Sequence, residues 1–116
     1  MKRADAVCTA YRGSTQRLAH PKSYDEVLAY VKKTLPLYEA ALRKLEGLKP
    51  PKGDEASVQN WLAADRRIVK AEQQLADAAQ RRDFPDVVAA ANEVQQGGVD
   101  ARHAAADLGL QVCATV

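Results

Sequence analysis

The sequence predicts an all-α fold, an antiparallel up-down four-helix bundle formed by one domain over residues 1–116. Ala is abundant and aromatic residues make up only 5% of the chain, a composition that favours closely packed helices. Apolar residues recur every three or four positions in four segments, and short connections separate these segments. Because short connections make consecutive helices antiparallel neighbours, an up-down bundle is expected.

The first two helices are predicted over residues 4–19 and 23–47. The first ends before His20-Pro21, and the second begins at a capping box in which Ser23 precedes Glu26 by three residues. Pro36 predicts a kink in the second helix, because proline has no backbone N–H to donate. The apolar residues of this helix follow three- and four-residue steps that are typical of bundle packing: Leu28, Val31, Leu35, Tyr38, Leu42 and Leu45.

The last two helices are predicted over residues 54–82 and 83–109. Asp54 is expected to cap the third helix, and Gly109 to be the residue just beyond the end of the fourth. Gly97-Gly98 lies within the fourth helical pattern and predicts an interruption of that helix, since glycine weakens a helix interior.

The chain has two cysteines, Cys8 and Cys113, close to its two ends. Both termini of an up-down four-helix bundle lie at the same end, so a disulfide between them is expected. The alternative is a pair of unrelated buried thiols. For the disulfide to form, the tail after Gly109 has to fold back along the first helix, or the helices have to be offset.

A disulfide predicts an oxidising, extracytoplasmic or secreted location. The first residues, Met1-Lys2-Arg3, are not followed by the apolar segment of a signal peptide. The expectation is therefore a mature chain from which a signal peptide was removed, with Met1 added to it.

Three segments resemble small exported helical-bundle proteins of actinobacteria: Leu48-Lys49-Pro50-Pro51, Asp83-Phe84 and Leu108-Gly109-Leu110-Gln111-Val112-Cys113. The resemblance runs over most of the chain from Cys8 onward and implies export and a paired cysteine. Many of those proteins carry a signal peptide or a lipid anchor, whereas this chain has no lipobox before Cys8. The resemblance implies no activity and no site residues. The chain also resembles, more faintly, short helical haem carriers, but no residues match the haem ligands of those proteins.

Two carboxylates interrupt the apolar face of the third predicted helix. Asp65 and Glu72 are seven residues apart and therefore share one face of the helix. Counting residues from the turn before the fourth helix places Arg102 level with Asp65. One interpretation is a partly buried Asp65–Arg102 ion pair that fixes helix register. The other is a polar pocket in the middle of the bundle, formed by Tyr38, Asp65, Glu72 and Arg102.

The chain lacks the residues that are typical of several other classes of function. His20 and His103 are single and far apart, so no metal site and no cofactor is expected. The serines occupy positions with structural explanations, and no phosphate-binding loop is present, so an enzyme is not expected. The net charge is +2 and the basic residues form no stripe, so nucleic acid is not an expected partner. No apolar run approaches the roughly 18 residues of a membrane span, so no membrane span is expected.

The sequence thus predicts a non-enzymatic extracytoplasmic module that binds an unknown protein or small molecule. The alternatives are a small-molecule or haem carrier with a pocket between the helices, and a purely structural scaffold.

Overall fold

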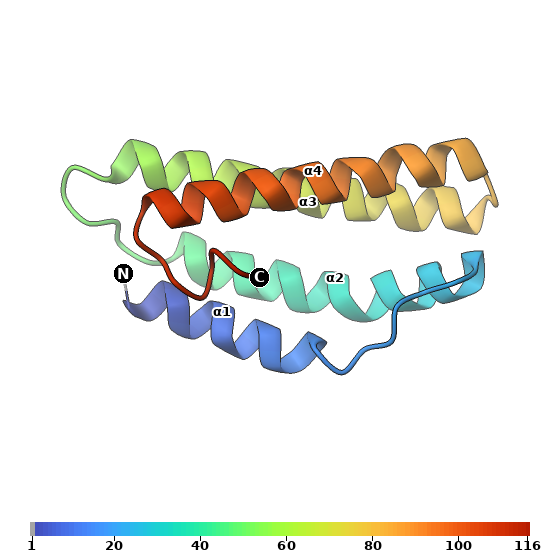
Figure 1. Ribbon diagram of the computed structural model, residues 1–116, viewed down its shortest axis with the longest axis horizontal. Helices are drawn as coiled ribbons and strands as arrows, with labels where there is room; N and C mark the ends of the chain where they lie inside the picture. Colours follow the sequence, from blue (N-terminus) through green and yellow to red (C-terminus); the bar gives the residue numbers. More distant parts are fainter. Residues whose placement is uncertain (1) are drawn as a thin grey trace.

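The computed structural model describes residues 2–116 and contains four helices and, within those residues, no strand. The prediction of an all-α fold with four helices is therefore confirmed. The molecule is elongated, with principal extents of 46 × 25 × 20 Å (Figure 1). The helices are α1 (Lys2–Thr15), α2 (Tyr24–Glu46), α3 (Glu55–Gln80) and α4 (Phe84–Asp107).

The connections alternate between the two ends of the molecule. The α1–α2 connection and the α3–α4 turn lie toward one end, and the α2–α3 loop and the start of the C-terminal tail lie at the other (Figure 1). Helix α1 is shorter than predicted, ending at Thr15 rather than Ala19. Beyond Thr15 the chain crosses to α2 without regular structure up to Ser23.

Side-chain caps define two of the helix starts. The Oγ of Ser23 accepts a hydrogen bond from the backbone N–H of Glu26, at 3.2 Å, and Asp83 accepts one from the N–H of Asp86, also at 3.2 Å. Each bond satisfies one N–H that has no partner within its own helix. Asp54 occupies the N-cap position of α3, as predicted, but its side chain makes no cap hydrogen bond. Glu55 instead accepts from the N–H of Gly53 at 2.9 Å.

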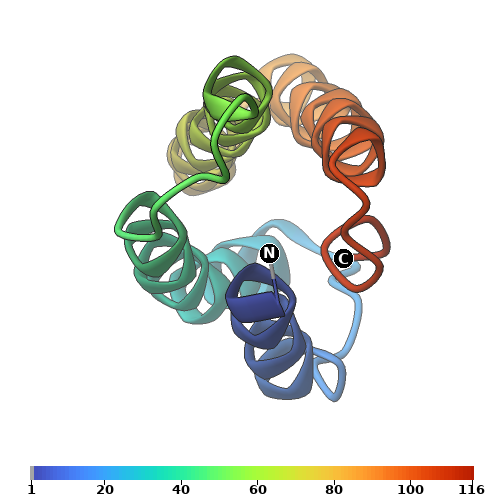
Figure 2. The ribbon, with the colours of Figure 1, turned by 90° about the vertical axis from the view of Figure 1, so that its left-hand side faces the viewer.

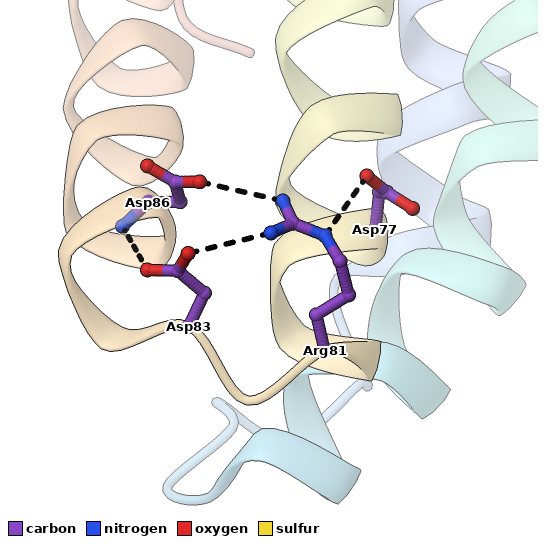
Figure 3. A network of polar contacts seen from close by, with 4 residues as sticks. All are labelled: Asp77, Arg81, Asp83 and Asp86. Carbon is purple, nitrogen blue, oxygen red and sulfur yellow. Dashed lines mark hydrogen bonds and ion pairs between the residues drawn. The ribbon is translucent and has the colours of Figure 1, made fainter.

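The turn between α3 and α4 is held by a group of exposed ion pairs (Figure 3). The guanidinium of Arg81 lies 3.4 Å from Asp77, 3.3 Å from Asp83 and 3.4 Å from Asp86. Arg82 follows in a left-handed conformation, with φ of 55°. That conformation lets the N–H of Asp83 reach the carbonyl of Ala78, so α3 ends and α4 begins within three residues.

Gly109 reverses the chain at the end of α4. Its φ of 77° is in the left-handed region that glycine adopts without strain. The N–H of Leu110 reaches the carbonyl of Ala105 and that of Gly109 reaches Ala106, which together form a Schellman motif. Leu110 is buried. The tail of residues 108–116 therefore folds back against the bundle, as the cysteine pairing requires.

The tail occupies the space between α1 and α4 (Figure 2). Helix α3 packs against α2 and α4, while the helix packing of α1 is against α2. A disulfide joins Cys8 of α1 to Cys113 of the tail, with their Cα atoms 5.3 Å apart, as the sequence predicts. One hydrophobic core includes buried residues of all four helices together with Leu110 and Cys113.

The side chain of Asp5 binds the backbone of the tail. Its carboxylate accepts hydrogen bonds from the N–H groups of Gln111 at 3.1 Å, Val112 at 2.9 Å and Cys113 at 3.0 Å. Burial raises the pKa of Asp5 and these three donors lower it, with a net shift below the ordinary value. The tail is thus attached to α1 both covalently and by a carboxylate that favours its ionised form.

The predicted kink at Pro36 and the predicted interruption at Gly97-Gly98 both fall within continuous helices. Helix α4 runs unbroken from Phe84 to Asp107, so the predicted interruption at Gly97-Gly98 is wrong. Gly97 lies in this helix against Ile68, where a Cβ atom would come within 2.8 Å of Cγ1. Helix α2 continues through Pro36, and a bend of its axis there stays a prediction.

Removal of the disulfide tests how far the tail stabilises the fold. We expect the double substitution Cys8→Ala and Cys113→Ala to lower the free energy of unfolding by about 2–5 kcal/mol, because the bond closes nearly the whole chain into one loop. Urea titration followed by circular dichroism measures the change, and the reduced wild-type protein is the matched control. A loss below about 0.5 kcal/mol, the range of surface substitutions, would contradict this role.

Candidate functional site

A cavity of about 260 Å³ lies between the four helices and the C-terminal tail. Its walls are mainly aliphatic and aromatic, with a few polar groups among them. This is the usual composition of a small-molecule site. The lining residues that bear on its chemistry are Cys8, Tyr11, Tyr38, Trp61, Asp65, Glu72, Gly98, Arg102 and Cys113.

Helix α3 supplies one complete wall of the cavity. Trp61, Asp65, Ile68 and Glu72 follow one another at steps of four, three and four residues, so they form a single stripe along the helix. The sequence predicts that Asp65 and Glu72 share a face, and the structure directs that face toward the centre of the molecule. All four predicted pocket residues, including Tyr38 and Arg102, line this one cavity.

Asp65 is held by Tyr38 rather than by Arg102. The Tyr38 hydroxyl donates a hydrogen bond of 2.6 Å to Oδ1 of Asp65, whose residue is only 7% exposed. Burial raises the pKa of Asp65 to about 6, although the Tyr38 hydrogen bond and the charge of Arg66 lower it. The expected Asp65–Arg102 ion pair is not formed among residues 2–116. A neutral hydroxyl reaches the carboxylate from α2 and takes the place that the guanidinium was expected to fill.

Glu72 is the second carboxyl group in the cavity wall. Its Oε2 atom is buried and has no hydrogen-bond partner within residues 2–116. Burial, together with the negative charge of Glu39, raises the pKa of Glu72 to about 7. A buried carboxylate oxygen without a donor is costly, so this atom favours either a proton or a donor brought by a ligand.

Aromatic side chains gather around these two acids. The rings of Tyr11 and Tyr38 meet edge to face, with centroids 5.3 Å apart and an interplanar angle of 80°. With Trp61, they are three of the chain's six aromatic residues. Burial raises the pKa of both tyrosines above their ordinary value, so the two phenols are neutral near pH 7. Tyr11 was missed as a site residue, although its position three residues after Cys8 places it on the same face of α1.

The two adjacent glycines of α4 have different surroundings. A Cβ atom on Gly97 would lie 2.8 Å from Cγ1 of Ile68, which is itself buried in the core. A Cβ atom on Gly98 would lie 3.1 Å from Nη1 of Arg102, the mobile end of a long side chain. Gly97 therefore serves the close packing of α4 on α3, whereas Gly98 borders the cavity.

Other kinds of site find little support in the described part of the chain. Within residues 2–116 no group of three or more His, Cys, Asp or Glu side chains lies close enough to hold a metal ion. None of the helices described there is both long and apolar enough to cross a membrane. No protein-family model, curated protein or solved structure matches this chain.

Substitution of each glycine by alanine separates packing from the cavity. We expect Gly97→Ala to lower the free energy of unfolding by about 1–3 kcal/mol through overpacking against Ile68. We expect Gly98→Ala to be neutral or to stabilise the protein by up to about 1 kcal/mol, because alanine favours the helix. Chemical denaturation of the two variants measures both effects. Equal effects at the two positions would contradict the assignment of close packing to Gly97 alone.

The buried position of Glu72 predicts a pH-dependent effect of its removal. Its pKa is raised on folding, so the folded state loses stability as the pH rises from the ordinary pKa toward about 7 and the buried carboxyl ionises. We therefore expect Glu72→Gln to stabilise the protein by roughly 1–3 kcal/mol at pH 8, with the gain declining as the pH falls to 4.5. Urea titrations at both pH values measure this difference. Asp107→Asn, at an exposed carboxylate, is the control, and a gain at Glu72 that is the same at both pH values would contradict the explanation.

Proposed function

We propose that this protein is a non-enzymatic binding module that takes up one small organic molecule in its central cavity. The observation that carries the proposal is the cavity itself, in which apolar and aromatic walls from every helix surround two buried carboxyl groups. Binding sites for small molecules combine apolar walls with a few polar groups that orient the ligand. The two carboxyl groups lie on one rigid helix, which suits positioning of a ligand.

The size of the cavity favours a small ligand over a macrocycle. Its volume of about 260 Å³ is just below the roughly 300–1,000 Å³ of sites for drug-sized molecules. Neither histidine lines it, and both are exposed, so the haem-carrier alternative has only tyrosine as a potential iron ligand. A molecule with a single ring or a short chain fits this volume better.

The alternative of a protein partner has weaker support. The exposed large apolar side chains of the described residues are few and belong to three segments: Leu37 on α2, Phe84 and Val88 one turn apart on α4, and Val116 in the tail. Scattered apolar residues are usual on protein surfaces and do not define an interface. A purely structural scaffold is also less favoured, because Glu72 lowers stability without a hydrogen-bond partner that would compensate.

The proposal places the protein outside the cytoplasm. The disulfide between Cys8 and Cys113 supports an oxidising location, and so does the resemblance to small exported proteins of actinobacteria. The proposal also takes the helices as an antiparallel up-down bundle. A bend of α2 at Pro36, two residues before Tyr38, would widen the space beside that side chain.

Filling the cavity tests the proposal. We expect at least one of three similarly shaped probes (benzyl alcohol, benzylamine and benzoate) to bind the wild-type protein, and we expect Gly98→Leu to abolish this binding. Gly98 borders the cavity, and the atoms nearest to a Cβ at this position belong to the flexible end of Arg102, so a larger side chain here is expected to reduce the space for a ligand. Saturation-transfer NMR detects binding, and thermal unfolding checks that the variant is folded.

Ala91→Leu is the control, because it places the same leucine side chain at an exposed position of α4. This control should bind the probes as the wild type does. If none of the three probes binds the wild type, or if Gly98→Leu binds as well as the control, the cavity is not the binding site and the proposal is wrong.

A further inference from the structure

We infer that the ligand of the cavity is a small organic cation whose ammonium group carries N–H bonds and whose apolar part is the size of one ring. This inference rests on the proposed function and adds the chemical class of the ligand. It follows from three features of the cavity: its charges, its aromatic walls and one buried acceptor without a donor.

The charges in the wall of the cavity are predominantly negative. Asp65 and Glu72 both line it, and Glu39 lies close enough to Glu72 to raise the pKa of that group. Arg102 is the one basic residue of the lining, and it forms no ion pair among residues 2–116. The charged groups that shift the pKa values of the two cavity acids are Arg66 and Glu39, not Arg102. A positive ligand would therefore offset charge that the protein leaves uncompensated.

The aromatic residues suit the same ligand. Tyr11, Tyr38 and Trp61 reach the cavity from three different helices, and the faces of aromatic rings attract cations. Trp61 lies one turn before Asp65 on the same stripe of α3. A ligand with a ring and a charged amine can thus place its apolar part against the aromatic side chains and its nitrogen beside the acids.

The unpartnered oxygen of Glu72 distinguishes between kinds of cation. Oε2 of Glu72 is buried and accepts no hydrogen bond within residues 2–116, whereas Asp65 already accepts one from Tyr38. A primary or secondary ammonium brings an N–H donor together with its charge, and such charge-assisted bonds are about twice as strong as neutral ones. A quaternary ammonium would neutralise the charge and leave the oxygen without a donor. The geometry therefore favours ammonium groups that still carry hydrogen.

Binding of this ligand depends on the ionisation of the two acids. The ionisable groups around them are Tyr11 on α1, Tyr38 and Glu39 on α2, Arg66 on α3, and Arg102 on α4. Asp65 and Glu72 ionise near pH 6 and pH 7, so a larger fraction of both is charged at pH 8 than at pH 5.5. The affinity for an ammonium therefore rises with pH over this range, and binding at lower pH releases protons.

Isothermal titration calorimetry with four probes of similar shape tests the inference: benzylamine, benzyl alcohol, benzoate and benzyltrimethylammonium. At pH 8 we expect benzylamine to bind at least about 10-fold more tightly than benzyl alcohol and more tightly than benzyltrimethylammonium, and we expect no binding of benzoate. At pH 5.5 the affinity for benzylamine should fall by about 10-fold, whereas that for benzyl alcohol should not change.

Two variants identify the residues responsible. Glu72→Gln should reduce the affinity for benzylamine to near that for benzyl alcohol, so that the preference for the cation is lost. Asp107→Asn, which changes an exposed carboxylate away from the cavity, should alter neither affinity. Benzyl alcohol or benzoate binding as tightly as benzylamine, or an unchanged benzylamine affinity in Glu72→Gln, would overturn the cation assignment and leave the proposed function standing. Failure of all four probes to bind would overturn both.

Discussion

The attachment of the C-terminal tail to α1 is the constraint on which the rest of the structure depends. Helix α1 packs on α2, but its connection to the α3–α4 side of the molecule runs through the tail. Cys8 binds that tail covalently, and Asp5, one helical turn earlier, accepts three of its backbone hydrogen bonds. These contacts attach α1, a helix of only 14 residues, to the rest of the molecule.

The two attached segments form part of the cavity wall. Its lining includes Tyr11 and Cys8 of α1 and Cys113 of the tail, so two of its walls come from the attached segments. The same walls keep water away from Asp65 and Glu72, and desolvation is the main cause of their raised pKa values. Cys8 and Cys113 thus belong to the lining of the same cavity as Asp65 and Glu72.

Much of the architecture was predictable from local patterns. The capping residue Ser23 and the reversal at Gly109 each have a local physical signature, and both were located correctly. The buried face of α2 was predicted less well. Leu35, a member of the predicted apolar series, is half-buried, whereas Thr34, which is not a member, is buried. Periodicity gives the face of a helix but not its rotation against neighbours, which is set by packing with the rest of the fold.

The site was predictable only in part, for the same reason. The spacing of Asp65 and Glu72 gave their common face, because seven residues are two turns of any helix. Counting residues along α3 and α4 from the turn between them gave Arg102 as the partner of Asp65, but the hydroxyl of Tyr38 is the group that binds Asp65. Such a count gives the height of a residue along the bundle, but not the length of its side chain or the direction in which its helix is rotated. The role of Asp5 depends on the path of the tail, which has no periodic pattern from which it can be predicted.

The two buried acids do not support the same conclusion about function. Asp65 has a donor in Tyr38, and such a bond between α2 and α3 can fix the relative position of two helices in a simple scaffold. Glu72 has no comparable structural explanation, because its buried oxygen has no partner and its charge is opposed by Glu39. A glutamine or an apolar residue of similar size would serve a scaffold better. A carboxylate without a partner in the wall of an aromatic cavity is therefore the strongest argument in the structure for a ligand.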